Sequence, residues 1–287
     1  MRPLSVLIAV TFFLFSCQKE VGSSNTSNAP TDTSALSKFL KATGITDQQV
    51  KNHLDSLITR ARNHGWWDLC KVIYPLVGGS ENSCKFNLKD PKDANESFRL
   101  SFMGDTWTYT SVGINPGASG YGYTYFNPSN QIADQNSVHM SIFSVTDAPG
   151  EDDNADIGAF NLSASSGFYL SARTNWPDTS GKPFGYIGDR AFQGQGVNGE
   201  GYFLMTKNTS DISFYRDSSV MTSLAATATA LPNMDLFLCN QNFSGAAQPY
   251  NRGFSQRGLA FVTIGSGISD ELEARMYLDI SAFVENK

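Results

Sequence analysis

Basic residues are too few in this sequence to form a nucleic-acid-binding surface. Lys and Arg together number 21 against 27 Asp and Glu, and the formal net charge is −6. No stretch of the chain carries a basic stripe. Binding to DNA or RNA depends on Lys and Arg side chains that neutralise phosphates. The charge balance therefore excludes nucleic acid as an expected partner.

Long apolar runs and familiar catalytic motifs are missing as well. After residue 16, no apolar run reaches the ~20 residues that a membrane-spanning helix needs. The chain has no nucleophile elbow, no phosphate-binding loop and no HExxH motif. Its three histidines, His53, His64 and His139, show no metal-ligand spacing. We therefore expect a protein that is not an enzyme and that needs no resident cofactor.

The most pronounced apolar run lies at the N-terminus and ends at a cysteine. Residues 1–16 combine an arginine with about a dozen apolar residues, as in a secretory signal, but lack the small residues that ordinary signal peptidase prefers. The run resembles the bacterial lipobox, with Leu14 and Ser16 ahead of Cys17. This resemblance implies that Cys17 is acylated and becomes the first residue of the mature chain, anchored stably by several acyl chains. The alternative is a secreted protein in which Cys17 is incidental.

The residues that follow Cys17 predict a location and a tether. The stretch "QKE", residues 18–20, resembles the lysine-and-acid tags that direct some Gram-negative lipoproteins to the outer face of the outer membrane. We expect an outer-membrane lipoprotein that faces outward, with the periplasmic face as the alternative. Residues 17–34 are rich in Ser, Thr and Asn and almost lack large apolar groups. Such a segment cannot offset its ordering entropy by burial, so it is predicted to be a flexible tether.

Helical spacing of apolar residues is typical of residues 35–79. Apolar side chains recur on one face before Gly44 and again in the stretch that ends at Gly65, and glycine is a common residue after the last turn of a helix. The stretch "WWDLCKVIYPLVGG" at residues 66–79 is expected to add one or two turns. The sequence thus predicts a helical appendage over residues 35–79.

From Cys84 onward the hydrophobic period changes to two. Ten or more short runs of alternating character are separated by Gly, Pro, Asn and Asp, as in "TWTYTS", "SVHMSIFSV" and "GLAFVTI". This pattern favours a two-sheet sandwich over a parallel α/β fold. A helix that begins after Ser269, with acidic residues in its first turn, closes the chain. The predicted fold class is therefore mainly β, with a sandwich over residues 80–287.

Several motifs resemble a known family. Residues 39–93, with "GITD", "VGG" and "KFNLK", are similar to a module of bacteriophage tail and virion proteins and of bacterial surface proteins. The stretches "ISFYRDS", "LPNMDLFLC" and "RGLAFVTIGSGISDELEARMYLDISAFV" resemble the closing part of a concanavalin A-like, laminin-G-like jelly roll. The resemblance covers about residues 39–287 and implies a jelly-roll β-sandwich. Such folds serve lectins, glycanases and interaction domains alike, so the resemblance bears on the fold more than on function.

Carbohydrate binding needs exposed aromatic rings beside amide and hydroxyl groups, and two stretches offer them. In "SGYGYTYFNPSN", the side chains alternate, so three tyrosines share one strand face, opposite Phe126. This face is either packed into the core or turned outward as a platform for sugars. The three are Tyr121, Tyr123 and Tyr125. A second candidate is a Pro-rich loop that carries Asn175, Trp176 and Asp178.

An acidic stretch has three interpretations. Its carboxylates are Glu151, Asp152, Asp153 and Asp156. Alternate acids on one strand of a jelly roll are how some relatives place two carboxylates for glycoside hydrolysis, but the flanking residues here favour a loop. A flexible acidic loop is also a possible Ca²⁺ site, because Ca²⁺ takes several oxygen ligands. The third interpretation is a solvated acidic hairpin.

The remaining cysteines predict a disulfide. Outside the cytoplasm thiols tend to pair, and three cysteines remain once Cys17 is lipidated. We expect a Cys70–Cys84 disulfide, at two positions where the similar proteins lack cysteine, with Cys239 as a buried thiol. A Cys84–Cys239 bridge is the alternative.

The sequence as a whole predicts a membrane-anchored, non-catalytic binding module whose expected ligand is carbohydrate. The main rival is a structural protein–protein interaction domain, by similarity to the phage modules. A divergent glycan hydrolase is a third hypothesis.

Overall fold

The computed structural model describes residues 33–104, 106–148, 155–174, 181–196, 198–243, 246–247 and 254–286. Residues Thr31–Lys287 belong to one compact unit. Several predicted features lie outside the described residues: the leader, the acylated cysteine, most of the tether, three acids of the acidic stretch and the Pro-rich loop. The predicted site residues concerned are Cys17, Glu151, Asp152, Asp153, Asn175, Trp176 and Asp178.

The described helices are few, and three of them are long. These three are α1 (Thr33–Thr43), α2 (Gln48–His64) and α5 (Asp270–Glu285). The short ones are η1 (Trp67–Leu69), α3 (Glu81–Cys84), η2 (Asn95–Ser97) and α4 (Pro128–Gln131). The α2 helix is capped by Asp47, whose side chain accepts a hydrogen bond from the Val50 amide, and it ends at Gly65 in the left-handed conformation.

Eight strands form the first sheet, which we call sheet A. Its order is β13-β12-β11-β6-β17-β4-β3, and β1 also pairs with β17. The pairs are antiparallel. The strands are β1 (Cys70–Tyr74), β3 (Thr108–Thr110), β4 (Gly113–Asn115), β6 (Val138–Ser144), β11 (Gly201–Lys207), β12 (Asp211–Arg216), β13 (Ser219–Ala225) and β17 (Leu259–Gly265).

Nine strands form the second sheet, sheet B. Its order is β10-β9-β8-β7-β14-β5-β2, with β15 paired to β7 and β16. Its pairs are antiparallel except for the parallel pair of β15 and β7. The strands are β2 (Ser101–Met103), β5 (Tyr121–Tyr123), β7 (Ile157–Asn161), β8 (Ser166–Thr174), β9 (Lys182–Gly188), β10 (Arg190–Gln193), β14 (Phe237–Leu238), β15 (Gln241–Phe243) and β16 (Ala246–Ala247).

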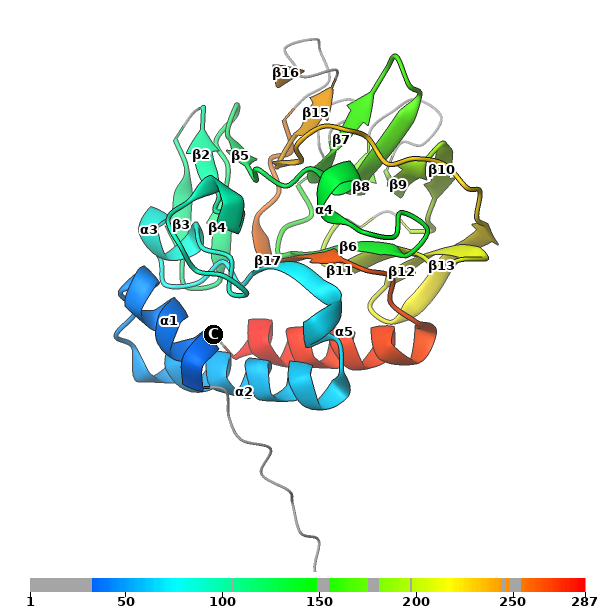
Figure 1. Cartoon of the computed structure of the whole chain (residues 1–287). Coiled ribbons are helices and arrows are strands. Elements are labelled where there is room, and N and C mark those ends of the chain that lie inside the picture. The colour runs from blue at the N-terminus through cyan, green and yellow to red at the C-terminus, as the bar shows by residue number, and fades with distance from the viewer. Residues whose placement is uncertain are drawn as a thin grey trace, which may run out of the picture. The chain divides into compact units, whose positions relative to one another are not determined.

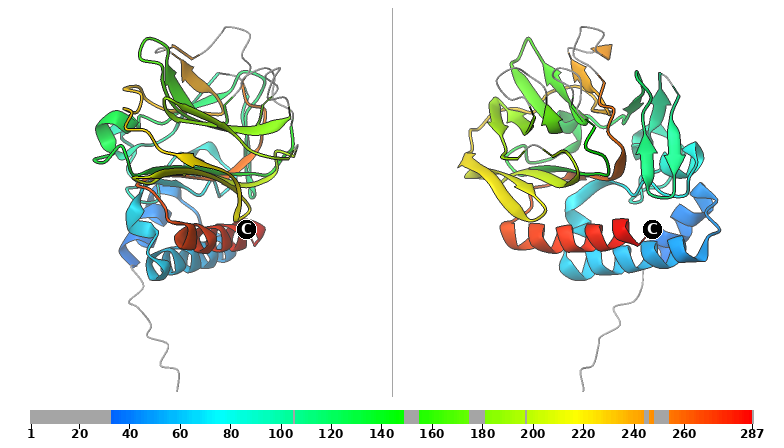
Figure 2. Two further views of the ribbon diagram at one scale, coloured as in Figure 1. Left: turned by 90° about the vertical axis from the view of Figure 1, so that its right-hand side faces the viewer. Right: turned by 180° about the vertical axis from the view of Figure 1, so that it is seen from behind.

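The described chain is layered, with α2 and α5 beneath sheet A and sheet B above it (Figure 1). One core cluster fills the space between the two sheets, and a second packs sheet A against α1, α2 and α5. Figure 2 shows the same order of layers from two further sides. The fold is therefore a mainly β two-sheet sandwich with a C-terminal helix, as the sequence predicted, and only sheet B keeps a face away from the helices.

Strand β11 was missed by the alternation rule, although it lies inside sheet A. Its residues point in turn into both core clusters: Phe203 and Met205 pack between the sheets, whereas Tyr202 and Leu204 pack against the helices. A strand that is buried on both faces reads as a continuous apolar run and shows no period of two. Because both of its faces are apolar, β11 was not recognised as a strand from the sequence, whereas the neighbouring β6 alternates with the polar His139 and Ser141.

The prediction of one or two further helical turns at residues 66–79 is confirmed only for the single turn η1. The next five residues form β1, which pairs with β17 along Val72–Tyr74. The β-branched Val72 and Ile73 suit a strand that is buried on both faces. The helical segment is consequently joined to the sandwich by a strand of sheet A, within one compact unit.

The predicted Cys70–Cys84 disulfide is not formed, and neither is the alternative Cys84–Cys239 bridge: all three cysteines are buried thiols. Cys70 points from β1 toward the helices, whereas Cys84 lies in the core between the sheets. The Cys84 thiol donates a hydrogen bond to the Val77 carbonyl at 3.4 Å. Strand β1 thus separates the two thiols, which residue spacing alone did not reveal.

Candidate functional site

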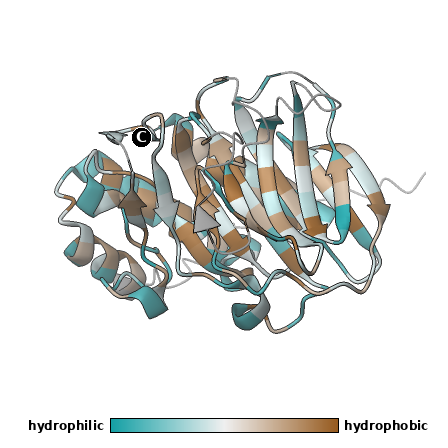
Figure 3. Cartoon of the chain, turned by 90° about the horizontal axis from the view of Figure 1, so that it is seen from above, coloured by the Kyte–Doolittle hydropathy of each residue, from teal (hydrophilic) through white to brown (hydrophobic). Residues whose placement is uncertain are grey.

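The outer surface of sheet B carries a set of aromatic side chains that belong to neither core cluster. Their strand neighbours, such as Phe168 and Leu170 around Tyr169, point into the core between the sheets instead. Figure 3 looks onto this side of the molecule, where the strands of sheet B lie side by side. We call the set the aromatic face; it comprises Tyr121, Tyr123, Tyr125, Phe160, Tyr169, Phe184, Tyr186, Phe237, Phe243 and Phe254.

The first group of rings is centred on β5 and β14. The ring centroids of Tyr123 and Tyr125 are 4.5 Å apart, and Phe237 of β14 lies 5.0 Å from Tyr123 and 5.1 Å from Tyr121. Phe254 continues the group, 6.3 Å from Tyr121. The three tyrosines are half-buried, because each ring leans on a neighbouring ring instead of standing free.

The second group lies on β7, β8, β9 and β15. Phe160 of β7 contacts Phe243 at 5.7 Å and Tyr186 at 5.3 Å between centroids. Tyr169 of β8 stacks on Tyr186 at 5.5 Å and on Phe184 at 5.8 Å. Cross-strand aromatic pairs of this kind stabilise a sheet, and the rings of this group are half-buried.

Two glycines make this packing possible. At Gly158 of β7 the backbone has φ +153°, and a Cβ atom would lie 2.0 Å from the Cβ of Tyr169. At Gly167 a Cβ atom would lie 2.7 Å from the Tyr186 ring and 2.8 Å from the Phe160 ring. A side chain at either position would displace the rings. Gly158 pairs with Tyr169 on one side and with Phe237 on the other, so it lies between the two groups.

Hydrogen-bonding groups accompany the first group of rings. The Tyr123 hydroxyl donates to the Asp235 carboxylate at 2.7 Å, and the Tyr125 and Ser101 hydroxyls are 3.0 Å apart. Burial and, secondarily, the Asp235 carboxylate raise the pKa of Tyr123 above its usual value, so this phenol stays protonated at neutral pH. The Arg99 guanidinium lies 5.6 Å from the Tyr125 ring centroid. The rings are therefore held in place by fixed polar contacts.

A pocket of about 330 Å³ adjoins the second group. Asn161 follows Phe160 directly on β7, and Asp189 is close enough to Tyr186 to raise the pKa of that phenol, after the larger effect of burial. Its wall combines apolar residues such as Leu231 and Pro232 with small polar side chains, among them Asn161, Ser165, Ser166, Asp189, Thr229 and Asn233. Such groups provide directional hydrogen bonds to a polar ligand.

The sequence identified only part of this surface. Tyr121, Tyr123 and Tyr125 share the outer side of one strand, with Phe126 on the core side, as the alternation predicted. The partner rings on the other strands were missed. Tyr169 lies on the face of β8 opposite Phe168, and nothing in the sequence identified which sheet neighbours would bring further rings beside it.

Asp156, predicted as a possible calcium ligand, is already neutralised. Its carboxylate forms a fully buried ion pair with Arg257, whose Nε lies 2.8 Å from Oδ1 and 3.0 Å from Oδ2. The Ala172 amide also donates to Asp156 at 2.6 Å, and the Ser255 hydroxyl donates to it as well. A carboxylate that faces a guanidinium and two further donors is not available to a cation, so the assignment of Asp156 to a metal site is corrected.

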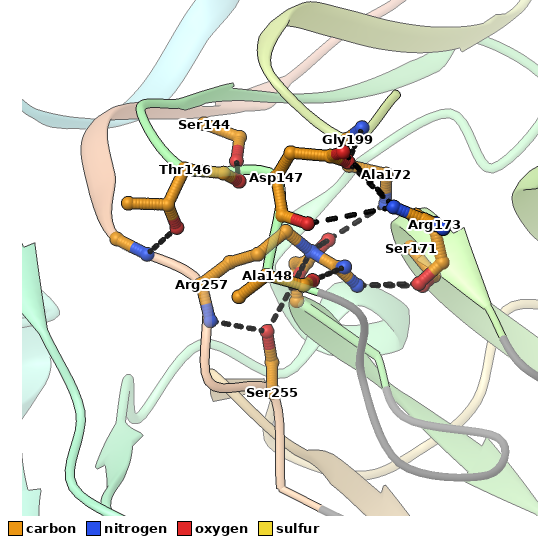
Figure 4. Close-up of polar contacts among 12 residues, drawn as sticks. Ser144, Thr146, Asp147, Ala148, Ser171, Ala172, Arg173, Gly199, Ser255 and Arg257 are labelled. Atoms are coloured by element: carbon orange, nitrogen blue, oxygen red, sulfur yellow. Dashed lines mark hydrogen bonds and ion pairs between the residues drawn. The ribbon is translucent and has the colours of Figure 1, made fainter. Parts of the chain in front are cut away.

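The same guanidinium joins several segments (Figure 4). Arg257 donates to the Ala148 carbonyl at 2.7 Å and to the Arg173 carbonyl at 2.6 Å. Arg173 in turn donates to both carboxylate oxygens of Asp147, each at 2.9 Å, and the pKa of Asp147 lies below its usual range. Asp147 thereby holds a segment that leads into the acidic stretch. The arrangement is structural, and within the described residues no group of three or more His, Cys, Asp or Glu could hold a metal ion.

One buried Cys–His contact deserves a chemical test. The Cys70 sulfur lies 3.9 Å from Nε2 of His139, and both side chains are buried. Burial raises the pKa of the Cys70 thiol to about 12 and lowers the pKa of His139 to about 4. A nucleophilic cysteine needs a lowered thiol pKa and access to substrate. This pair is neutral at pH 7 and enclosed, so its role is in packing.

None of the described helices has the length and apolar character needed to cross a bilayer.

Comparison with known proteins finds remote structural similarity at low sequence identity. No protein-family model and no curated protein matches the sequence. Domain 4 of AbnA, a GH43 extracellular arabinanase from Geobacillus stearothermophilus solved with arabinotriose, aligns with TM-score 0.48 and 9% identity over 72% of this chain and 98% of that chain. The binding domain of botulinum neurotoxin serotype D aligns with TM-score 0.47 and 12% identity over 74% of this chain and 52% of that chain. A Trypanosoma rangeli sialidase aligns with TM-score 0.45 and 11% identity, covering 81% of this chain and 39% of that chain. The similarity to phage virion modules stays a prediction.

Proposed function

We propose that this protein is a lipid-anchored, outward-facing binding module of the outer membrane that holds carbohydrate on the aromatic face of sheet B. The observation that carries the proposal is the arrangement of ten aromatic side chains over the side of the sandwich that the helices leave uncovered. Apolar patches that remain accessible on a soluble domain commonly mark interaction sites. Sugar rings present C–H faces to aromatic rings and hydroxyls to polar groups, and this face offers both.

The proposed binding needs no catalysis. The Asp156 carboxylate is held in an ion pair with Arg257, and the Asp235 carboxylate accepts a hydrogen bond from the Tyr123 hydroxyl. Glycoside hydrolysis requires two carboxyl groups on opposite sides of one glycosidic bond, one of them protonated. The proposal therefore assigns the aromatic face to retention of a glycan chain. Release of reducing ends from a bound polysaccharide would favour the hydrolase hypothesis instead.

The first prediction is that single ring deletions weaken glycan retention. The ligand is tested as a panel of soluble polysaccharides in affinity electrophoresis with residues 17–287 carrying Cys17→Ser. Tyr123→Ala and Tyr186→Ala, one from each group, are each expected to weaken retention by about tenfold or more, because central aromatic contacts dominate binding energy. The matched control is Tyr277→Ala, a half-buried tyrosine on α5, in the helical layer below sheet A, which should leave retention unchanged.

Thermal unfolding of each variant separates lost binding from lost folding. Tyr123 and Tyr186 are half-buried, so their truncation should lower stability less than truncation of a core aromatic, which costs about 3–5 kcal/mol. Retention that persists in both folded variants would show that the aromatic face is not the sugar site. Absence of any retained polysaccharide for the wild type would reject the carbohydrate assignment.

A structural protein–protein interaction domain is the second candidate. The aromatic face also supports this candidate, because the centres of protein–protein interfaces are rich in Tyr and Phe and poor in charged residues. In that case both ring deletions should leave polysaccharide retention unaffected but release a protein that co-purifies with the wild type from detergent-solubilised membranes.

The second prediction concerns the anchor. Cells that express the full chain and take up an alkyne-bearing fatty acid should incorporate the label into the wild type, whereas Cys17→Ser should remain unlabelled because it lacks the acylated sulfur. A surface-directed protease should then degrade the labelled protein on intact cells. Equal labelling of the variant, or wild-type protein that is found unlabelled in the medium, would contradict lipid anchoring.

A further inference from the structure

One continuous row of positions crosses sheet B from strand to strand. Tyr123 of β5 is directly opposite Phe237 of β14, which is opposite Gly158 of β7. Gly158 is in turn opposite Tyr169 of β8, which is opposite Tyr186 of β9. These five strands are consecutive neighbours in sheet B, whose strands Figure 3 shows side by side. We call these five positions the cross-strand row; it runs across the strands because the residues of antiparallel pairs face each other in that direction.

The cross-strand row carries rings in two contacting pairs. The ring centroids of Tyr123 and Phe237 are 5.0 Å apart, and those of Tyr169 and Tyr186 are 5.5 Å apart. Gly158, which has no side chain, separates the two pairs. The three tyrosines are half-buried, whereas Phe237 is 4% exposed. The tyrosines therefore supply both apolar surface and hydroxyl groups along the row.

Both ends of the cross-strand row continue into small side chains. Beyond Tyr123 the register leads to Ser101 of β2, and beyond Tyr186 it leads to Ala191 of β10. Strands β2 and β10 stand at the two ends of the strand order of sheet B. A site for the end of a glycan needs a wall across its path, and neither Ser101 nor Ala191 is large enough to form one. The row is therefore open toward both edges of the sheet.

The cross-strand row is long enough for several sugar units. Neighbouring strands are about 4.8 Å apart, so the four intervals from β5 to β9 span roughly 19 Å. One unit of an extended glycan is close in length to one strand spacing, so the row matches about four units. The tyrosines of residues 121–125, which follow one another along the chain, extend over only about 13 Å. The longer aromatic track thus crosses the strands.

We propose that the cross-strand row binds an internal segment of an extended linear polysaccharide, about four sugar units long, with the glycan running across the strands of sheet B. This inference rests on the carbohydrate part of the proposed function and specifies the class of ligand. Successive sugar units contact successive positions of the row, so the affinity depends on chain length. The two ends of the glycan lie beyond Ser101 and Ala191 and take no part in recognition.

Oligosaccharides of graded length test the proposal. The probes are size-fractionated partial acid hydrolysates of each polysaccharide in the panel, from about two to about eight sugar units, titrated calorimetrically into residues 17–287 carrying Cys17→Ser. We expect the affinity to rise by about tenfold or more between two and four units and to level off beyond about five, where further units extend past the row. Borohydride reduction of the terminal sugar should change the affinity of a chain of about six units by less than about twofold.

Tyr186→Ala shortens the cross-strand row from one end. This variant should bind four-unit chains about tenfold more weakly, but two-unit chains by less than about twofold, because a short chain still binds at Tyr123 and Phe237. The control is Tyr277→Ala, on α5 and outside the aromatic face, which should change the affinity by less than about twofold at every length. Circular dichroism verifies that both variants are folded.

The outcomes separate this inference from the proposed function. If no probe binds to the wild type, both are rejected. If two-unit chains bind as tightly as longer ones, or reduction of the terminal sugar abolishes binding, the protein recognises a single sugar or a chain end, and the extended path is overturned while carbohydrate binding stands. An equal loss at every length for folded Tyr186→Ala would also contradict the extended path. The wild-type length series needs no variant, so the test does not depend on the folding of Tyr186→Ala.

Discussion

Replacement of Arg257 by alanine is expected to lower the free energy of unfolding by about 3–5 kcal/mol. The side chain is fully buried, and its removal leaves the equally buried Asp156 carboxylate without a countercharge. Two carbonyls, of Ala148 and Arg173, also lose their donor. The loss should appear in urea titrations followed by tryptophan fluorescence and as a melting temperature lower by roughly 10 °C.

Two controls distinguish the buried pair from charge loss in general. Arg275→Ala removes an exposed i,i+4 ion pair with Glu271 and should cost less than about 0.5 kcal/mol. The double variant Asp156→Asn/Arg257→Met removes both buried charges and should be more stable than Arg257→Ala, because the cost of a broken buried pair is mainly that of the remaining charge. A loss below about 1 kcal/mol for Arg257→Ala would mean that this network does not stabilise the sandwich.

Glu273 is expected to make the protein less stable as the pH rises. This side chain of α5 is 1% exposed, and its Oε1 has no hydrogen-bond partner among the described residues. Burial, with smaller contributions from Asp270 and Asp217, raises its pKa from 4.5 to about 7, and a hydrogen bond from Ser218 opposes the shift. The folded state therefore binds this proton more tightly than the unfolded state. The cost is absent below pH 4.5 and complete above pH 7.

His139 has the opposite effect and conceals that of Glu273 in the wild type. Burial lowers the pKa of His139 from 6.5 to about 4, so stability rises as the pH increases from 4 to 6.5. Over most of this interval the two contributions offset each other. The stability of the wild type should accordingly change little between pH 4.5 and 6.5.

Glu273→Gln should reveal the difference, because it removes the carboxyl that titrates and retains its shape. The variant's free energy of unfolding, minus that of the wild type, should increase by roughly 3 kcal/mol between pH 4 and pH 8. Urea titrations at half-unit pH intervals measure this difference. Effects that do not depend on pH, such as the hydrogen bonding of the new amide, cancel in the comparison. A difference that is constant over the range would show that Glu273 does not titrate with a raised pKa.

The fold class could be predicted from the sequence because it depends on local patterns. Alternation in runs such as "SVHMSIFSV" and the acidic first turn after Ser269 are set by residues that are close in the chain. The same reasoning failed for β1 and β11, whose side chains are apolar on the side toward the helices as well as on the side toward sheet B. Where apolar side chains fill both faces, as in these two strands, the sequence shows no period of two.

The candidate site, like the fold, could be predicted from the sequence only in part. The sequence by itself placed Tyr121, Tyr123 and Tyr125 on one side of a strand, since side-chain direction alternates with residue number. Only the tertiary structure decided that this side is the outer one and that Phe237 and Tyr186, distant in sequence, extend it. Tertiary structure also assigned Asp156 to Arg257, 101 residues away, and placed the Cys70 and Cys84 thiols on opposite sides of β1. Pairing between distant strands depends on the packing of the whole chain, and no short stretch of sequence encodes it.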